Sequence, residues 1–267
     1  MSPTARLIDP PPALAPATER IELADPVFIS DLHLSADHPH TLDAFLRFAR
    51  EVAPSHRELV ILGDLFEYWA GDDDLADPVA QIASGGLIGL ARSGRRVFVM
   101  RGNRDLLIGP AFVQHVGATL LADPALAAIG DQRVLLAHGD AYCTRDEPYQ
   151  RFRAQTHDPD FQRGFLARPL AERKAFIGQA RSHSESAKRM KAADIMDVTP
   201  DAIGAALRAA GVTLMIHGHT HRPARHGFVL DHAPAQRFVL PDWDHDATPV
   251  RGGYIRFAGG APVAEDF

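Results

Sequence analysis

Seven side chains that can bind a metal ion stand in short polar stretches spread along this chain of 267 residues. They are two carboxylates, one amide and four imidazoles, namely Asp31, Asp64, Asn103, His33, His138, His219 and His221. This mixed oxygen and nitrogen set suits Mn²⁺, Fe or Zn²⁺ better than a soft metal or an all-oxygen calcium site. Seven ligands are too many for one ion that keeps a position open for catalysis. They are enough for two ions that share a carboxylate and hold a phosphoryl group between them.

Each polar stretch follows a short apolar run of the kind that forms a buried strand. The runs with their polar ends are VFISDLHLS (27–35), LVILGD (59–64), RVFVMRGNRD (96–105), RVLLAHGD (133–140) and LMIHGHTHRP (214–223). Any one of these endings alone is common in ordinary turns. Their joint occurrence favours one shared site, because ligands in α/β sheets collect outside the carboxyl ends of the strands.

Helical patterns lie between several of the expected strands. Residues 41–52 have apolar side chains at helical spacing, with Thr41 as the expected cap. Asp77 and Pro78 predict the start of a second helix, and Pro110 predicts the start of a third. Strands that alternate with helices predict an α/β fold.

The composition is that of an ordinary globular protein, with 46% hydrophobic and 23% charged residues. The net charge of −6 argues against a nucleic-acid-binding protein that depends on overall positive charge. Cys143 is the only cysteine, which excludes an intrachain disulfide and a thiolate zinc cluster and suits the cytosol. Residues 1–24 are rich in proline and alanine, and we expect an extension outside a domain of residues 25–267. No run approaches the ~20 apolar residues that span a bilayer.

Residues 144–200 interrupt the alternation with a length that is unusual for a plain connection. The stretch predicts helices near 146–156 and 160–167 and a longer helix that begins at Pro169. Residues 151–191 contain ten basic and four acidic residues, a net charge of +6. Apolar side chains lie among these cations: Phe161, Phe165, Leu166, Leu170, Phe176 and Ile177. The combination suits an anionic lipid or membrane surface, or an amphipathic subdomain packed on its own core.

The motifs DLH, GD, GNRD, HGD and GHTH, in this order, resemble those of the calcineurin-like metallophosphoesterases. GDLFEYWAGDDD, HGDAYCTRDE and the IMDV segment resemble, more narrowly, the pyrophosphatases of lipid A biosynthesis that act on UDP-2,3-diacylglucosamine, over about residues 26–260. The resemblance implies an αββα sandwich with a dinuclear Mn²⁺ site and a helical lid. It also implies hydrolysis of this lipid-linked UDP-sugar to UMP and 2,3-diacylglucosamine 1-phosphate, with a hydroxide held by both ions attacking the α-phosphorus.

The resemblance also implies a role for each matching residue. The implied metal ligands are Asp31, His33 and His221 for the first ion, Asn103, His138 and His219 for the second, and Asp64 between them. The implied catalytic residues are Asp64, Asn103, Arg104 and His138. The implied substrate contacts are Asn103, Arg104, Asp146, Ser184, Lys188, Lys191 and His219, with Lys188 standing where the family pattern leads us to expect Asn. The implied location is peripheral, on the cytoplasmic face of the inner membrane, with no nucleic acid and no obligate protein partner.

Arg104 favours a particular kind of phosphate chemistry. Arginine cannot donate a proton at neutral pH, but its guanidinium binds phosphate through two bonds and stabilises developing negative charge. A phosphate leaving group needs little protonation, so Arg104 favours cleavage of a pyrophosphate over that of an alkyl monoester. Two alternatives stay open. A nucleotide or dinucleoside polyphosphate hydrolase on the same fold would need no basic and apolar insert, and a scaffold without metals would not need all seven ligands.

Three further features have an ordinary structural interpretation. Asp140 follows His138 by two residues and is either a carboxylate that orients an imidazole or a simple turn residue. His217 is interpreted as a structural histidine on its strand. The three aspartates of residues 72–74 are interpreted as caps of a solvated turn and not as metal ligands.

Overall fold

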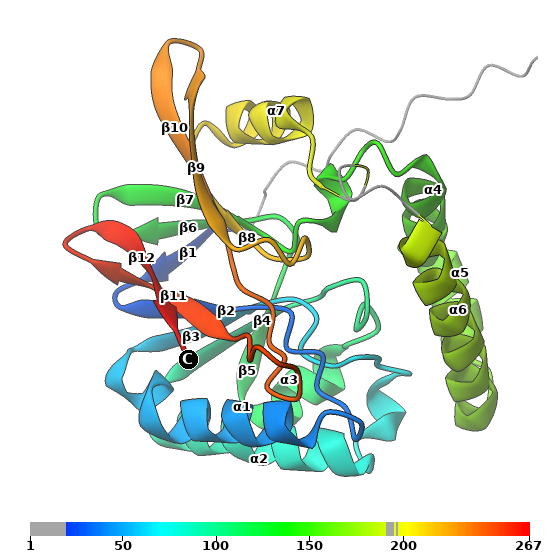
Figure 1. The fold of residues 1–267 in the computed structure, drawn as a ribbon. Helices are drawn as coiled ribbons and strands as arrows, with labels where there is room; N and C mark the ends of the chain where they lie inside the picture. Colours follow the sequence, from blue (N-terminus) through cyan, green and yellow to red (C-terminus); the bar gives the residue numbers. More distant parts are fainter. Residues whose placement is uncertain (1–19, 191–194, 196) are drawn as a thin grey trace, which may run out of the picture.

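The structure is a computed structural model that describes residues 20–190, 195 and 197–267, without the side chains of residues 181–190. These residues form two six-stranded sheets and seven α-helices (Figure 1). Most of the proline- and alanine-rich extension expected at the start of the chain lies outside the described residues. All five apolar runs that predicted strands are strands.

The first sheet contains the strands that lead to Asp31, Asp64 and Asn103. Its strands lie in the order β12 (Ala261–Asp266), β11 (Gly253–Ala258), β2 (Pro26–Ile29), β3 (Glu58–Leu62), β4 (Arg96–Met100) and β5 (Ala118–Leu121). The four strands β2 to β5 run parallel, whereas β11 pairs antiparallel with both β2 and β12. Because β2, β3 and β4 are parallel neighbours, their carboxyl ends emerge at the same edge.

The second sheet contains the strands that lead to the remaining histidines. Its strands lie in the order β1 (Arg20–Leu23), β6 (Ala125–Ile129), β7 (Gln132–Ala137), β8 (Leu214–His217), β10 (Ala233–Val239) and β9 (Ala224–Leu230). The central strands β7 and β8 pair in parallel. His138 and the GHTH motif therefore leave neighbouring strands at the same edge of this sheet.

The two sheets pack face to face, and helices cover both outer faces (Figure 1). Side chains of a strand alternate between its faces, so Val27 and Ile29 pack toward the helices while Phe28 packs toward the other sheet. The covering helices are α1 (Pro39–Glu51), α2 (Pro78–Arg92) and α3 (Pro110–Val116) on the first sheet and α7 (Pro200–Ala210) on the second. This arrangement confirms the predicted αββα sandwich.

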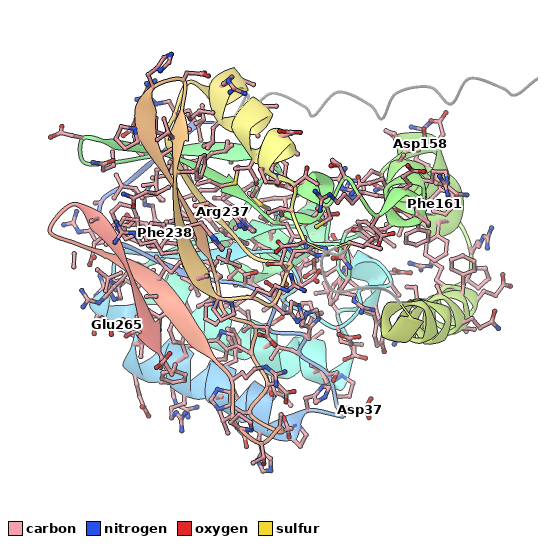
Figure 2. The ribbon with its side chains drawn as sticks, turned by 45° about the horizontal axis from the view of Figure 1, so that its top comes forward. Asp37, Asp158, Phe161, Arg237, Phe238 and Glu265 are labelled. Atoms are coloured by element: carbon pink, nitrogen blue, oxygen red, sulfur yellow. The ribbon has the colours of Figure 1, made fainter. Side chains whose placement is uncertain are left out.

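Three helices between β7 and α7 stand together beside the sandwich, and we call them the insert (Figure 1). They are α4 (Glu147–Thr156), α5 (Pro159–Leu166) and α6 (Leu170–Met190). All three helices were predicted from the sequence at nearly these positions. Figure 2 shows Asp158 and Phe161 on the insert, well separated from Arg237 and Phe238 of the second sheet.

Capping aspartates and aromatic rings organise the insert. The side chains of Asp146 and Asp158 accept N–H groups at the starts of α4 and α5. The ring of Phe165 lies 6.2 Å from that of Phe161 on the same helix and 5.5 Å from that of Phe176 on α6. Phe165 is buried, whereas Phe176 is exposed over 42% of its surface. The insert thus has a small aromatic core of its own and also presents apolar surface to solvent.

The prediction that Thr41 caps the first helix is wrong. Helix α1 begins at Pro39, so Thr41 lies inside its first turn. The free N–H groups of His40 and Thr41 are accepted by the carboxylate of Asp246 at 3.1 and 3.0 Å, and the Thr41 hydroxyl donates to the same carboxylate at 2.8 Å. A distant residue supplies the cap that the local pattern assigned to threonine. By contrast, Asp77 caps α2 as predicted.

Replacing Asp246 with alanine should lower the free energy of unfolding by about 1 kcal/mol, because the two N–H groups lose their acceptor. Denaturant unfolding would measure this change. The Thr41→Ser variant is a matched control, since serine keeps the hydroxyl and the backbone N–H, and it should unfold nearly as wild type does. An unchanged stability of Asp246→Ala would show that the cap contributes nothing.

Candidate metal centre

The carboxyl ends of four strands bring six potential metal ligands together in two groups. The first group is Asp31, His33 and His221, and the second is Asp64, His138 and His219. Within each group the ligand atoms all lie within 4.8 Å of one another. The strands β2, β3, β7 and β8 deliver these side chains from both sheets, so the candidate site lies where the two sheets meet.

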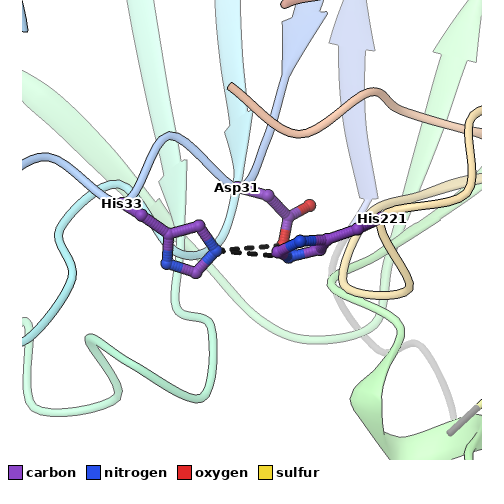
Figure 3. A group of neighbouring side chains, drawn as sticks. All are labelled: Asp31, His33 and His221. Carbon is purple, nitrogen blue, oxygen red and sulfur yellow. Dashed lines mark hydrogen bonds and ion pairs between the residues drawn. The ribbon is translucent and has the colours of Figure 1, made fainter. Parts of the chain in front are cut away.

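The first group converges from the ends of β2 and β8 (Figure 3). Nε2 of His33 lies 3.3 Å from Nε2 of His221, and Oδ1 of Asp31 lies 3.4 Å from the latter nitrogen. Figure 3 shows the two imidazole rings turned toward one another, with the carboxylate between them. Two imidazole nitrogens and one carboxylate oxygen that face a common point are a suitable ligand set for a divalent transition metal.

Asp64 lies between the two groups. Its Oδ2 atom is 3.8 Å from Nε2 of His33 in the first group and 3.7 Å from Nε2 of His138 in the second. Asn103 joins the second group, since its Oδ1 lies 3.1 Å from the same nitrogen of His138. One carboxylate oxygen therefore faces both groups, which is the position that a bridging ligand requires.

The electrostatics of Asp31 fit a cation. The residue is fully buried. Its Oδ1 is without a partner in hydrogen-bonding geometry among the described residues. Burial alone would raise the pKa of this carboxyl, but the surrounding histidines, His221 foremost, hold the pKa far below its ordinary value. A buried, ionised oxygen that has only imidazole nitrogens near it and no well-formed hydrogen bond is well placed to bind a metal ion.

The pKa values of the two histidines in the second group are shifted in opposite directions. Burial lowers the pKa of His138, but nearby carboxylates, Asp64 first, outweigh it and raise the pKa to about 10. Burial and the neighbouring His138 instead lower the pKa of His219 to about 3. The neutral imidazole is the form that binds metal. A divalent cation among these groups would replace the positive charge that His138 otherwise carries as a proton.

The backbone at these residues adopts a conformation that is rare for side chains other than glycine. The described non-glycine residues with positive φ are Asp31, His33, Asp64, His219, His221, Asp231 and His232. The last two form the turn between β9 and β10, and the other five all belong to the two groups. Such a conformation costs free energy and tends to occur at functional sites.

Two glycines of the motifs provide room for the carboxylates. A Cβ atom at Gly102 would overlap Oδ1 of Asp64, and one at Gly218 would overlap Oδ2 of Asp31. Neither residue has a positive φ, so the close approach of neighbouring side chains alone explains why glycine is required at these positions. The glycines of the GNRD and GHTH motifs are therefore steric requirements of the site.

Each of three histidines has an outer partner that holds its ring. Nδ1 of His33 lies 2.9 Å from Glu67, Nδ1 of His221 lies 3.5 Å from Asp242, and Nδ1 of His138 lies 2.9 Å from the Leu62 carbonyl oxygen. These contacts leave the three Nε2 atoms directed at the two groups. Sequence reasoning missed both carboxylates. Glu67 lies in the GDLFEYWAGDDD stretch quoted above, whereas Asp242 lies outside every motif.

Asp140 is not the orienting partner of His138. Its carboxylate accepts hydrogen bonds from Nε of Arg153 at 2.8 Å and from the hydroxyl of Tyr149 at 2.7 Å, and both residues lie on α4. The Tyr149 ring in turn stacks on His219, with ring centroids 5.9 Å apart. Asp140 thus connects the insert to the second group, because a backbone carbonyl already occupies Nδ1 of His138.

Asp105 of the GNRD motif organises the loops behind Asp64. The buried Asp105 carboxylate accepts the N–H groups of Leu65 and Gly102, both at 2.8 Å. Burial and the neighbouring Asp64 raise the pKa of Asp105 to about 6. The residue ties the GD motif to the GNRD motif, which is a structural role.

The predicted substrate contacts are only partly described. The Arg104 N–H donates to Asp64 at 2.8 Å, and its guanidinium lies 3.5 Å from Glu67 at the edge of the site. Asp146 is buried and caps α4, so its carboxylate already has a structural contact. The side chains of Ser184 and Lys188 and the whole of Lys191 lie outside the described residues.

Gly102→Ala should destabilise the protein by about 2 kcal/mol, because the added Cβ displaces Asp64. It should also reduce the amount of divalent metal ion bound at equilibrium. Isothermal titration and thermal unfolding would measure the two effects. Gly85→Ala is the control, since its Cβ enters open space on α2 and favours the helix. Normal metal binding by Gly102→Ala would contradict the steric role of Gly102.

Comparison with known proteins places this geometry in a family. The model of the calcineurin-like phosphoesterases matches residues 26–223. A protein of Aromatoleum aromaticum named UDP-2,3-diacylglucosamine hydrolase is 49% identical over 90% of this chain and 96% of its own. Proteins of the same name from Ralstonia nicotianae and Cellvibrio japonicus are each 46% identical, over 96% and 82% of this chain and 98% and 91% of their own. The chain belongs to the calcineurin-like phosphoesterases and, among them, to the family of the UDP-2,3-diacylglucosamine hydrolases.

Proposed function

We propose that this chain hydrolyses the pyrophosphate bond of UDP-2,3-diacylglucosamine to UMP and 2,3-diacylglucosamine 1-phosphate. The observation that carries the proposal is the similarity to hydrolases of this name along nearly the whole chain, insert included. The two ligand groups joined by Asp64 supply the chemistry that such a hydrolase needs. The alternative, a hydrolase of nucleotides or dinucleoside polyphosphates, is not favoured by these similarities.

The proposed ligands divide between two divalent ions, most suitably Mn²⁺. The first ion would be held by Asp31, His33 and His221, the second by Asn103, His138 and His219, and both by Asp64. Bound divalent ions neutralise phosphate charge and lower the pKa of a water molecule enough to make it a nucleophile at neutral pH. The orphaned oxygen of Asp31 and the histidine-rich donor set support this assignment.

Arg104 would bind the diphosphate beside the two ion sites. Its backbone N–H is held by Asp64, and its guanidinium is near Glu67, so the side chain is oriented from two directions. Two parallel N–H bonds to phosphate would stabilise the charge that develops on the leaving phosphate. This role requires no proton from Arg104, which agrees with a phosphate leaving group, because such a group needs little protonation.

The acyl chains would begin at the sandwich, next to the first ligand group. A pocket of about 150 Å³ opens there, and its lining residues all belong to the sandwich, with Asp37, Asp74 and Asp77 among them. Its apolar lining is Leu34, Phe66, Trp69, Val79 and Ala80. Leu34 follows His33 directly, so the pocket adjoins the first ligand group. The sequence interpretation placed the whole apolar floor on the insert, whereas the sandwich offers part of it.

We also propose that the insert meets the cytoplasmic face of the inner membrane peripherally. Exposed apolar side chains among its many cations support this, namely Phe152, Leu166 and Phe176. In the described part of the chain, we find no helix with the length and apolar character of a membrane span. Ser184, Lys188 and Lys191 would contact the substrate from the end of the insert.

Replacing Asp64 with alanine should reduce turnover by about 100-fold or more and reduce bound metal at the same time, since both ions lose a ligand. Metal analysis of the purified variant and a UMP-release assay would measure both. Asp43→Ala is a control, because this exposed carboxylate lies on α1, outside both groups and outside the pocket. A variant of Asp64 that keeps two ions and near-normal turnover would contradict the dinuclear assignment.

The function itself is tested by a substrate panel with Mn²⁺. UDP-2,3-diacylglucosamine should be hydrolysed with release of UMP, and diadenosine tetraphosphate should be a poor substrate, because it has no acyl chains for the insert. In ¹⁸O-labelled water the label should appear in UMP, since attack is proposed at the uridylyl phosphorus. Faster cleavage of diadenosine tetraphosphate would favour the alternative, and label only in the lipid phosphate would overturn the proposed site of attack.

A further inference from the structure

Arg173, near the start of α6, is a charged side chain that is almost completely buried, with 2% of its surface exposed. Its Nε donates to the Arg168 carbonyl oxygen at 3.0 Å. One terminal nitrogen donates to the Ala70 carbonyl oxygen and the other pairs with Asp73. A buried guanidinium is costly unless its donors are satisfied. The position of Arg173 is therefore set by three acceptors, two of which belong to the sandwich.

Residues 70–74 receive this side chain, and we call them the docking turn. Gly71 has a φ of 132°, and a Cβ there would overlap a terminal nitrogen of Arg173 and lie 2.8 Å from Leu166 Cδ2. Helices α5 and α6 both reach the turn at this glycine. A larger residue would thus have to push the insert away from the sandwich.

The three aspartates of the docking turn divide their contacts between the sandwich and the insert. Asp72 accepts the N–H groups of Gly109 and Ala111, both at 2.9 Å, at the start of α3. Asp73 pairs with Arg173, and Asp74 lies 2.7 Å from Nζ of Lys174. The interpretation of these residues as caps of a solvated turn is incomplete. Asp72 anchors the turn, while Asp73 and Asp74 receive two consecutive cations of the insert.

The docking turn is connected to the candidate site through residues 67–69. Trp69 donates its N–H to the Arg104 carbonyl oxygen at 3.3 Å, and its Nε1 donates to Asp72 at 3.0 Å. Glu67, two residues earlier, contacts both His33 and Arg104. Residues 67–69 thus connect the docking turn, where the insert is attached, to Arg104, whose side chain would bind the diphosphate.

We infer that Arg173 is a positioning residue, which docks the insert on the turn of residues 70–74 and so sets the distance between the acyl-binding region and the diphosphate-binding site. The inference rests on the proposed function, because only a lipid-linked substrate must contact both regions at once. Arg173 itself would not contact the substrate. A substrate without acyl chains would be indifferent to the position of the insert.

A purely structural role for Arg173 makes a different prediction. If the side chain only held the fold together, its loss would affect all substrates alike. If it positions the insert, its loss raises KM for the diacylated substrate and leaves a small phosphodiester unaffected. The comparison between the two substrates separates these interpretations.

The test compares Arg173→Met with Arg163→Met, which removes an exposed cation of α5 that pairs only with Asp160 among the described contacts. For Arg173→Met, KM for UDP-2,3-diacylglucosamine should rise about tenfold or more, because small displacements of a positioned substrate have large effects. The kcat/KM for bis(4-nitrophenyl) phosphate should stay within about twofold, and the control should change neither constant by more than about twofold. An unchanged KM for the diacylated substrate, or equal losses on both substrates, would overturn the inference.

Two further measurements keep the result decisive. Gly71→Ala keeps the Arg173 side chain in the sequence but displaces it from the turn, so it should reproduce the rise in KM, and it replaces Arg173→Met if that variant fails to fold. Hydrogen exchange needs no substrate. It should be faster in α4 and α5 of Arg173→Met while the two sheets stay protected. If wild type does not cleave UDP-2,3-diacylglucosamine, the proposed function fails, and exchange that is unchanged in the insert would overturn the docking role independently.

Discussion

The burial of ionised groups where the two sheets meet is the constraint on which the rest of the site depends. Asp31, Asp64 and His138 are almost or wholly inaccessible to water. Charges taken out of water are costly unless opposite charges or hydrogen bonds compensate them. The lowered pKa of Asp31 and the raised pKa of His138 show how strongly these groups act on one another. Two divalent cations would satisfy the same groups without a proton on His138.

The surrounding structure holds this cluster in one arrangement. Positive φ values occur at five of the ligands of the two groups, and glycines such as Gly102 leave room for their side chains. Glu67 and Asp242 hold the outer nitrogens of His33 and His221 from different parts of the fold. Together they fix the ligand atoms before a cation binds, which reduces the reorganisation that binding requires.

The insert is attached by the same kind of interaction that defines the site. At one end Arg153 of α4 pairs with the buried Asp140, next to the second ligand group. At the other end Arg173 of α6 enters the docking turn and contacts Ala70, the residue directly after Trp69, which contacts Arg104. Both attachments are directional ion pairs and hydrogen bonds. Such contacts define position more sharply than apolar packing does, since they depend on distance and angle.

The sequence alone determined the five strands that lead to the site, six of the seven described α-helices and the set of candidate ligands, because these depend on local patterns. An apolar run before Asp64 or His138 predicts a strand and its polar end without knowledge of any other segment. Only the tertiary structure decided the partners of these residues. Asp246 replaces Thr41 as the cap of α1, Asp242 contacts His221, and Arg173 reaches the docking turn from about a hundred residues away in the chain. Contacts of this kind leave no periodic signal, since a side chain that pairs across the fold is chosen by proximity in space and not by its neighbours in sequence.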